Sequence, residues 1–190
     1  MALFTCTGLQ GPPHLTAPDL RLEAGELVLL RGPNGSGKTT WLRALADLDP
    51  VRGGQVRLDG RCRDDYEPTR WRQLVRYVHP DAPRLPASVA EAWRAMTLGT
   101  GAALPDDLPP ASDHRDLSSG EAQRMALAAA LAGVARVLLL DEPTSALDAG
   151  RALAAERSLQ QFVRAGRAAL WISHDEGLAE RLGVREVHLP

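Results

Sequence analysis

The sequence predicts an α/β domain with a largely parallel core sheet, and three observations lead to this fold class. Continuous apolar runs at Leu27–Arg31, Val137–Leu140 and Ala169–Ser173 are typical of strands buried on both faces of a parallel sheet. A stretch with the periodicity or composition of a helix follows each run. A glycine-rich segment joins the first run to its helix. Strands that alternate with helices in this way indicate an α/β domain.

Length and composition predict that residues 1–190 form a single globular domain. The chain is 44% hydrophobic and 24% charged, which is ordinary for a domain with a substantial core. Its net charge of −2 gives no electrostatic basis for binding nucleic acid or an anionic membrane. No signal peptide is expected, and no apolar run approaches the ~20 residues of a membrane span. Cys6 and Cys62 are expected to be free thiols in a reducing compartment.

Turn and breaker residues delimit the remaining elements. Gly53-Gly54 predicts a turn, and the alternation from Gln55 to Asp59 predicts an antiparallel strand beside the N-terminal segment. Residues 99–113 are expected to form an irregular loop. The four tryptophans are expected to be packing residues, with Trp93 the one candidate for exposure. The other predicted elements are helices at 39–48, 87–96, 118–132, 149–165 and 176–182, and strands at 74–78 and 185–189.

One lysine marks a candidate phosphate-binding loop. Lys38 is the only lysine among 22 lysine and arginine residues, and it lies in Gly32–Thr39, which fits G-x-x-x-x-G-K-[ST]. In this motif backbone N–H groups cradle phosphates, the lysine reaches the β- and γ-phosphates, and the next hydroxyl binds Mg²⁺. The glycines let the backbone approach the phosphates, and the following helix N-terminus favours anions. The predicted strand before the loop and helix after it disfavour a chance glycine-rich turn.

Two adjacent acids follow the second apolar run. Asp141 and Glu142 come directly after a predicted buried strand. An acid in this place next to a phosphate loop commonly holds Mg²⁺, often through water. Neighbouring side chains point to opposite faces, so Asp141 would face the metal and Glu142 the γ-phosphate and the attacking water. Two solvated loop acids are the alternative for this pair taken alone.

The segment Leu117–Glu121 opens a predicted helix and has two interpretations. Ser118 or Ser119 suits the N-cap position, and Glu121 can complete a capping box. The same exposed N–H groups can instead bind an anion. Residue chemistry alone does not separate the two interpretations.

Five segments occur in an order that resembles the nucleotide-binding domain of the ABC ATPase family. The order is the phosphate loop, Leu117–Glu121, Leu138–Pro143, Ser145–Asp148 and a lone histidine, His174, after a strand. The resemblance covers nearly the whole chain, from about residue 3 to residue 189. Five motifs in one order are a specific signal, which favours nucleotide chemistry where the separate motifs left alternatives open.

Each segment is similar to a named motif of that family. Gly32–Thr40 is similar to the Walker A motif, Val137–Asp141 to Walker B, and Leu117–Glu121 to the ABC signature. The four residues that start at Ser145 are similar to the D-loop. Glu142 looks like the catalytic glutamate. His174 looks like the switch histidine, which in the family contacts the γ-phosphate.

The resemblance implies a P-loop NTPase with an N-terminal antiparallel β subdomain and a short helical subdomain at about 82–135 inserted in the core. It implies ATP and Mg²⁺ as cofactors, with the metal held by Thr39 and Asp141. The implied catalytic residues are Lys38, Glu142 and His174. The implied nucleotide-binding residues are Gly32, Pro33, Asn34, Gly35, Ser36, Gly37, Lys38, Thr39, Thr40, Ser118, Ser119 and Gly120.

The family mechanism also implies partners. Two domains pack head to tail and trap two ATP molecules, and each site combines one chain's phosphate loop with the other chain's signature. This implies a homodimer on ATP binding that powers separate transmembrane permease chains. The chain would be cytoplasmic and would touch the inner face of the membrane only through those partners. Its small size and its motif sequences most resemble those of small bacterial export-type ATPases, including the iron-export FetA-like group.

Three departures from the family pattern stand out. The glutamine expected before the helical subdomain falls on Pro80, so we expect the metal to keep an extra water, with substitution by His79 or weaker coupling as alternatives. The aromatic residue that stacks on adenine falls near Leu9, with only Phe4 and His14 as nearby planar groups, so weak base discrimination is expected. The signature has serine and glutamate where glycine and glutamine are commoner, and activity is expected to persist.

Two other functions compete with the ATPase subunit of a transporter. A soluble ABC protein acting on DNA or ribosomes would usually carry a coiled-coil insertion or a second cassette, and this chain has neither. A nucleotide-gated structural partner with weak hydrolysis is opposed by Glu142 and His174 and favoured by Pro80 and Leu9.

Overall fold

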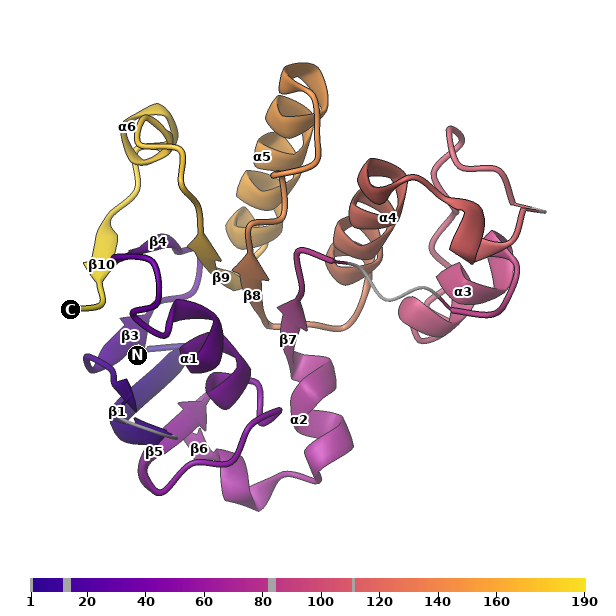
Figure 1. Ribbon diagram of the computed structural model, residues 1–190. Coiled ribbons are helices and arrows are strands. Elements are labelled where there is room, and N and C mark those ends of the chain that lie inside the picture. Colours follow the sequence, from indigo (N-terminus) through magenta and orange to yellow (C-terminus); the bar gives the residue numbers. More distant parts are fainter. Residues whose placement is uncertain (1, 12–14, 82–84, 111) are drawn as a thin grey trace.

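A parallel five-stranded sheet forms the centre of the computed structural model, which describes residues 2–11, 15–81, 85–110 and 112–190 (Figure 1). The strand order is β10-β4-β9-β8-β7, and each neighbouring pair is parallel. The strands are β4 (Leu27–Arg31), β7 (Val75–Val78), β8 (Val137–Asp141), β9 (Ala168–Ile172) and β10 (Glu186–His188). Every residue of β8 and β9 is buried, as the continuous apolar runs predict.

A second sheet, which is antiparallel, lies beside the first and shares no strand with it. Its strands are β1 (Phe4–Gly11), β2 (Leu15–Thr16), β3 (Leu20–Leu22), β5 (Gly53–Leu58) and β6 (Arg61–Cys62). β1 pairs antiparallel with β2, β3 and β5. The predicted fold class, a parallel core with an N-terminal antiparallel sheet, is confirmed.

Six α-helices accompany the sheets in the described part of the chain. They are α1 (Lys38–Leu45), α2 (Pro68–Leu74), α3 (Val89–Met96), α4 (Ser119–Ala132), α5 (Ala149–Arg164) and α6 (Leu178–Leu182). The predicted helix at 39–48 is too long, because the chain turns at Asp47, which has φ 60°. α2 was not predicted, although Pro68 at its first position is a usual helix start.

Three apolar clusters hold these layers together. Two lie on opposite faces of the parallel sheet, one under α1 and the antiparallel sheet, the other under α4, α5 and α6. The third joins α3 and α4 to the loop around Leu108, and the helical subdomain at about 82–135 stays a prediction. Figure 1 places α3 and α4 together, away from α1. None of the described helices is long and apolar enough to cross a membrane.

The tryptophans are all buried, so the prediction that names Trp93 as a candidate for exposure is wrong. Trp93 is 4% exposed, and its indole N–H donates to the carbonyl of Ala102 at 2.7 Å. Phe4 is also fully buried, with its ring 6.3 Å from that of Trp71. It therefore has no free face for a base. Leu9 is 2% exposed, and His14 lies outside the described residues.

Candidate functional site

The phosphate loop joins β4 to α1 at the carboxyl edge of the parallel sheet. Gly37 caps α1 in the left-handed region, with φ 90°, and within the described part of the chain the helix start has no side-chain cap. The Lys38 ammonium donates to the carbonyls of Gly32 and Pro33, both at 2.8 Å. The hydroxyl of Ser36 is buried and has no hydrogen-bond partner among the described atoms. Free N–H groups, an unpartnered hydroxyl and an ammonium fit a phosphate group.

Asp141 meets the phosphate loop from β8. The Thr39 hydroxyl donates to Asp141 Oδ2 at 2.7 Å, and the Tyr77 hydroxyl donates to the same oxygen at 2.9 Å. Asp141 is 3% exposed. Burial, and next the charge of Asp141, raise the pKa of Tyr77 well above its usual value, so the phenol stays a donor at neutral pH.

These oxygens suit Mg²⁺. The described residues contain no cluster of three or more His, Cys, Asp or Glu side chains that could hold a metal alone. Mg²⁺ is usually bound by one or two carboxylates together with substrate phosphates and water, rather than by a cage of protein ligands. The Thr39 and Asp141 oxygens beside a phosphate loop match that arrangement.

Glu142 has an unusual backbone conformation at the end of β8. Its φ is 46°, in the left-handed region that a non-glycine residue adopts at a cost of ~1–3 kcal/mol. Its N–H donates to the carbonyl of Ile172 at 3.0 Å. Its carbonyl accepts from the Gln123 amide and from the Ser145 hydroxyl, both at 3.0 Å. These contacts hold the strained turn.

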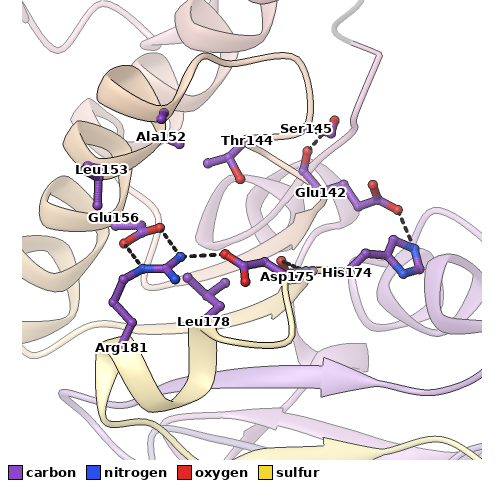
Figure 2. Close-up of a pocket in the computed structure, with 12 residues that line it drawn as sticks. Glu142, Thr144, Ser145, Ala152, Leu153, Glu156, His174, Asp175, Leu178 and Arg181 are labelled. Atoms are coloured by element: carbon purple, nitrogen blue, oxygen red, sulfur yellow. Dashed lines mark hydrogen bonds and ion pairs between the residues drawn. The ribbon is translucent and has the colours of Figure 1, made fainter.

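The Glu142 side chain meets His174. His174 Nε2 lies 3.0 Å from Glu142 Oε1, and the imidazole is 55% exposed (Figure 2). A cavity of about 300 Å³ next to them is lined by Gly32, Lys38 and His174, among others. A second cavity, of about 520 Å³, has both Glu142 and His174 in its wall. His174 lines both cavities, with Glu142 in the wall of the larger one and Lys38 in the wall of the smaller one.

The signature segment forms the capping box that the sequence allows. Ser118 caps α4, and its N–H and hydroxyl both donate to Glu121 Oε2, at 2.8 and 2.6 Å. The Ser118 hydroxyl lowers the pKa of Glu121, so the carboxylate is ionised at neutral pH. Gly120 packs against the D-loop, where an added Cβ would lie 2.9 Å from the carbonyl of Ala146. Ser118 and Ser119 are exposed, and α4 lies away from α1 in Figure 1.

Gln123 was missed in the sequence. It is 1% exposed, and its amide nitrogen donates to the carbonyls of Glu142 at 3.0 Å and Pro80 at 3.3 Å. Its amide oxygen accepts from the N–H of Ala146 at 3.0 Å. One side chain on α4 thus joins the strained turn at Glu142, the backbone of Ala146 and the carbonyl of Pro80. A glutamine inside an alanine-rich helical stretch was the available signal.

The side chain of His79 contacts its own segment, and its substitution for the missing glutamine stays a prediction. His79 Nδ1 accepts from the N–H of Asp81 at 2.9 Å, and its ring lies edge-on to Tyr77. Tyr77 is the side chain of this segment that reaches Asp141. No pattern in the sequence distinguishes Tyr77 from a residue that only packs in a strand.

Comparisons with known proteins agree with this geometry. Residues 15–145 match the family model described as ABC transporter. The chain is 33% identical to the aliphatic sulfonates import ATP-binding protein SsuB 2 of Agrobacterium fabrum, over 95% of this chain and 71% of that protein. It is 36% identical to the lipoprotein-releasing system ATP-binding protein LolD of Anaeromyxobacter dehalogenans, over 89% and 80%. The chain spans between about half and four fifths of the length of such relatives.

The fold is also similar to a solved one. An ATP-binding cassette, solved as a dimer in a post-hydrolysis state bound to ADP and Pi, matches with a TM-score of 0.81 at 23% identity. The match covers 98% of this chain and 94% of that chain. The family match spans more than half of the chain, and relatives above 30% identity cover most of it. The chain therefore belongs to the ABC transporter family and is an ATPase of that family.

Proposed function

We propose that this chain is the ATP-hydrolysing subunit of a membrane transporter and works as a head-to-tail homodimer that closes on ATP. The observation that carries this proposal is the pair of contacts at the end of β8. Asp141 bonds to Thr39 of the phosphate loop, and the next residue, Glu142, bonds to His174. Metal-holding and water-activating groups thus lie on two sides of one turn, beside the loop.

The loop residues 32–40 bind and orient the nucleotide. The backbone N–H groups and the Ser36 hydroxyl donate to phosphate oxygens, and Lys38 exchanges its two carbonyl partners for the β- and γ-phosphates. Thr39 and Asp141 hold Mg²⁺, which supplies charge neutralisation at the phosphates when bound. This part of the chemistry is positioning and charge stabilisation rather than covalent catalysis.

Glu142 and His174 act on the attacking water and the γ-phosphate. The Glu142 carboxylate is 35% exposed and can accept a proton from a water in the adjoining cavity. His174 contacts Glu142 and borders the cavity that includes Lys38. From there its imidazole can donate to a γ-phosphate oxygen.

A second copy completes each site. Ser118, Ser119 and Gly120 stand at the exposed start of α4, apart from their own phosphate loop in Figure 1. In a head-to-tail dimer they approach the γ-phosphate held by the facing chain. Gly120 has no side chain, which lets the start of α4 pack closely on the D-loop.

Transmembrane permease chains are the proposed partners, at the cytoplasmic face of the membrane. The relatives named above are ATP-binding proteins of import and lipoprotein-releasing systems. A groove of about 460 Å³ beside the Pro80 segment supports a docking place; its wall includes Arg76, His79 and Met96. The systems named differ in cargo and direction, so the export-type assignment stays a prediction.

The test is ATP turnover by the purified chain with Mg²⁺, for the wild type, Glu142→Gln and Glu67→Gln. Glu142→Gln should lose turnover and form an ATP-dependent dimer that gel filtration resolves. Glu67→Gln, which changes an exposed glutamate before α2, should behave as the wild type. Equal turnover in Glu142→Gln would contradict the role of that residue. A wild type that dimerises on ATP without turnover would identify the nucleotide-gated partner instead.

A further inference from the structure

We propose that Arg31 is a positioning residue for His174, because one guanidinium holds the backbone on both sides of that histidine. This inference rests on the proposed function, in which His174 contacts the γ-phosphate. Arg31 is the last residue of β4 and directly precedes the phosphate loop. It thus ties the loop that holds the phosphates to the loop that carries the histidine.

The contacts of Arg31 use both ends of its fork. Nη2 donates to the carbonyl of Asp175 at 2.7 Å, and Nη1 donates to the carbonyl of Ser173. Nε donates to Glu186 Oε1 on β10 at 2.8 Å, and this third bond fixes the orientation of the guanidinium. The Arg31 side chain is only 13% exposed. Every contact is charge-assisted, which strengthens it, and the bond to the Ser173 carbonyl is also part-buried.

The position of His174 explains why such a hold is needed. The ladder between β4 and β9 ends at the pair Leu30 and Ile172, so sheet hydrogen bonds stop before the histidine. The imidazole is 55% exposed, and one edge of the ring contacts the Glu142 carboxylate at 3.0 Å. The direction of the ring depends on this contact and on the backbone of residues 173–175, and Arg31 binds the carbonyls at both ends of that segment.

A second arginine steadies the same loop from the other side. Arg181 on α6 pairs with the Asp175 carboxylate at 2.6 Å and with Glu156 of α5 at 2.8 Å (Figure 2). Asp175 Oδ1 also accepts from the N–H of Gly177 at 3.0 Å. Arg181 thus holds the side chain of Asp175, whereas Arg31 holds the main chain and is the one connected to the phosphate loop.

Geometry of this kind affects rate more than binding. A displacement of ~1 Å of a catalytic group can reduce the rate of a reaction by ~100-fold. Phosphate binding by the loop itself uses Lys38 and backbone N–H groups, which Arg31 does not contact in the described structure. The loss of Arg31 should therefore lower kcat and change nucleotide affinity little. Lysine should not replace it, because a single ammonium lacks the planar fork that reaches two carbonyls.

The experiment is a double-mutant cycle on ATP turnover with Arg31→Leu, His174→Ala and the double variant, together with Arg31→Lys. We expect Arg31→Leu and Arg31→Lys to lower kcat by ~10-fold or more, with the Kd for ATP within ~3-fold of the wild type. In the His174→Ala background, Arg31→Leu should lower kcat by less than ~2-fold, because Arg31 acts through the histidine. Arg136→Leu is the matched control: this arginine pairs with Asp59 at the amino end of β8.

A direct readout of the ring keeps the inference separate from the proposed function. In NMR spectra of histidine-labelled protein, the His174 ring signals should shift or broaden in Arg31→Leu and Arg31→Lys and stay unchanged in Arg136→Leu. Multiplicative losses in the double variant, or unchanged His174 signals in a folded Arg31 variant, would overturn the positioning role. If His174→Ala turns over ATP as the wild type does while the signals still shift, the proposed role of His174 fails and the positioning of its ring stands.

Discussion

The Tyr77 hydroxyl donates to Asp141 Oδ2, the same carboxylate oxygen that accepts from Thr39. The aspartate expected to hold Mg²⁺ is thus oriented by a neighbour on β7, three residues before the proline that replaces the family glutamine. A hydrogen bond to a charged group contributes ~1.5–3 kcal/mol, enough to select one orientation of a carboxylate.

Replacement of Tyr77 by phenylalanine should raise the Mg²⁺ concentration that gives half-maximal ATPase activity by several-fold. The reason is that Asp141 loses one of its two donors and with it a fixed orientation. Tyr66→Phe is the control, since the Tyr66 hydroxyl donates to the carbonyl of Leu58, in the antiparallel sheet. An unchanged Mg²⁺ requirement in Tyr77→Phe would mean that the phenol only packs.

Gln123→Leu should lower ATP turnover by ~10-fold or more and reduce the melting temperature. The variant leaves the N–H of Ala146 without its partner, at a cost of ~1–3 kcal/mol, and loosens the strained turn at Glu142. Gln161→Leu, on the exposed face of α5, should change neither quantity. Full turnover in a destabilised Gln123→Leu would show that this glutamine supports the fold alone.

Glu121→Gln should lower the ATP concentration needed for dimerisation. The carboxylate is ionised and sits at the α4 N-terminus, where the facing chain's γ-phosphate is expected, so it repels that phosphate. Glutamine keeps the capping box and removes the charge. Glu91→Gln is the matched control, because Glu91 makes the same box with Ser88 on α3. Light scattering against ATP concentration measures the effect, and a requirement for more ATP would contradict it.

An amine-directed reagent should modify only the N-terminus and Lys38, and bound ATP should protect Lys38. The chain has one lysine, so mass spectrometry reads the site without ambiguity. In the absence of ATP the ammonium is held by two loop carbonyls, and these contacts are replaced when phosphate binds. A modified chain that still bound ATP normally would refute the role given to Lys38.

The stability supplied by Asp113 should be lost in acid. Arg115 lowers the pKa of Asp113 to about 2, and Asp113 caps the turn that leads to the signature. Because its folded pKa lies below the unfolded value of ~3.9, its contribution is complete above that value and falls as the pH drops toward 2. Urea unfolding of the wild type and Asp113→Asn should differ most near pH 7, and the difference should shrink between pH ~4 and ~2. An equal difference at both ends would contradict this.

Much of the fold follows from local patterns. Buried strands at β4, β8 and β9 appear as apolar runs because both faces of a parallel sheet are covered. The phosphate loop is equally local, since its glycines and Lys38 are consecutive. The end of α1 was less predictable, because the left-handed turn at Asp47 is supported by bonds to Arg63 and Arg72 from beyond the next strand.

The sequence by itself therefore determined the fold class, the phosphate loop, the Asp141–Glu142 pair and the order of motifs that indicates the family. Only the tertiary structure decided how those parts meet. Thr39 and Asp141 are 102 residues apart, and Arg31 and Asp175 are 144 apart. The physical reason is the strand order β4-β9-β8-β7, which makes neighbours of strands distant in the chain. Contacts between elements that are distant in the chain, such as those of Tyr77 on β7 and Gln123 on α4, leave no periodic pattern in the sequence.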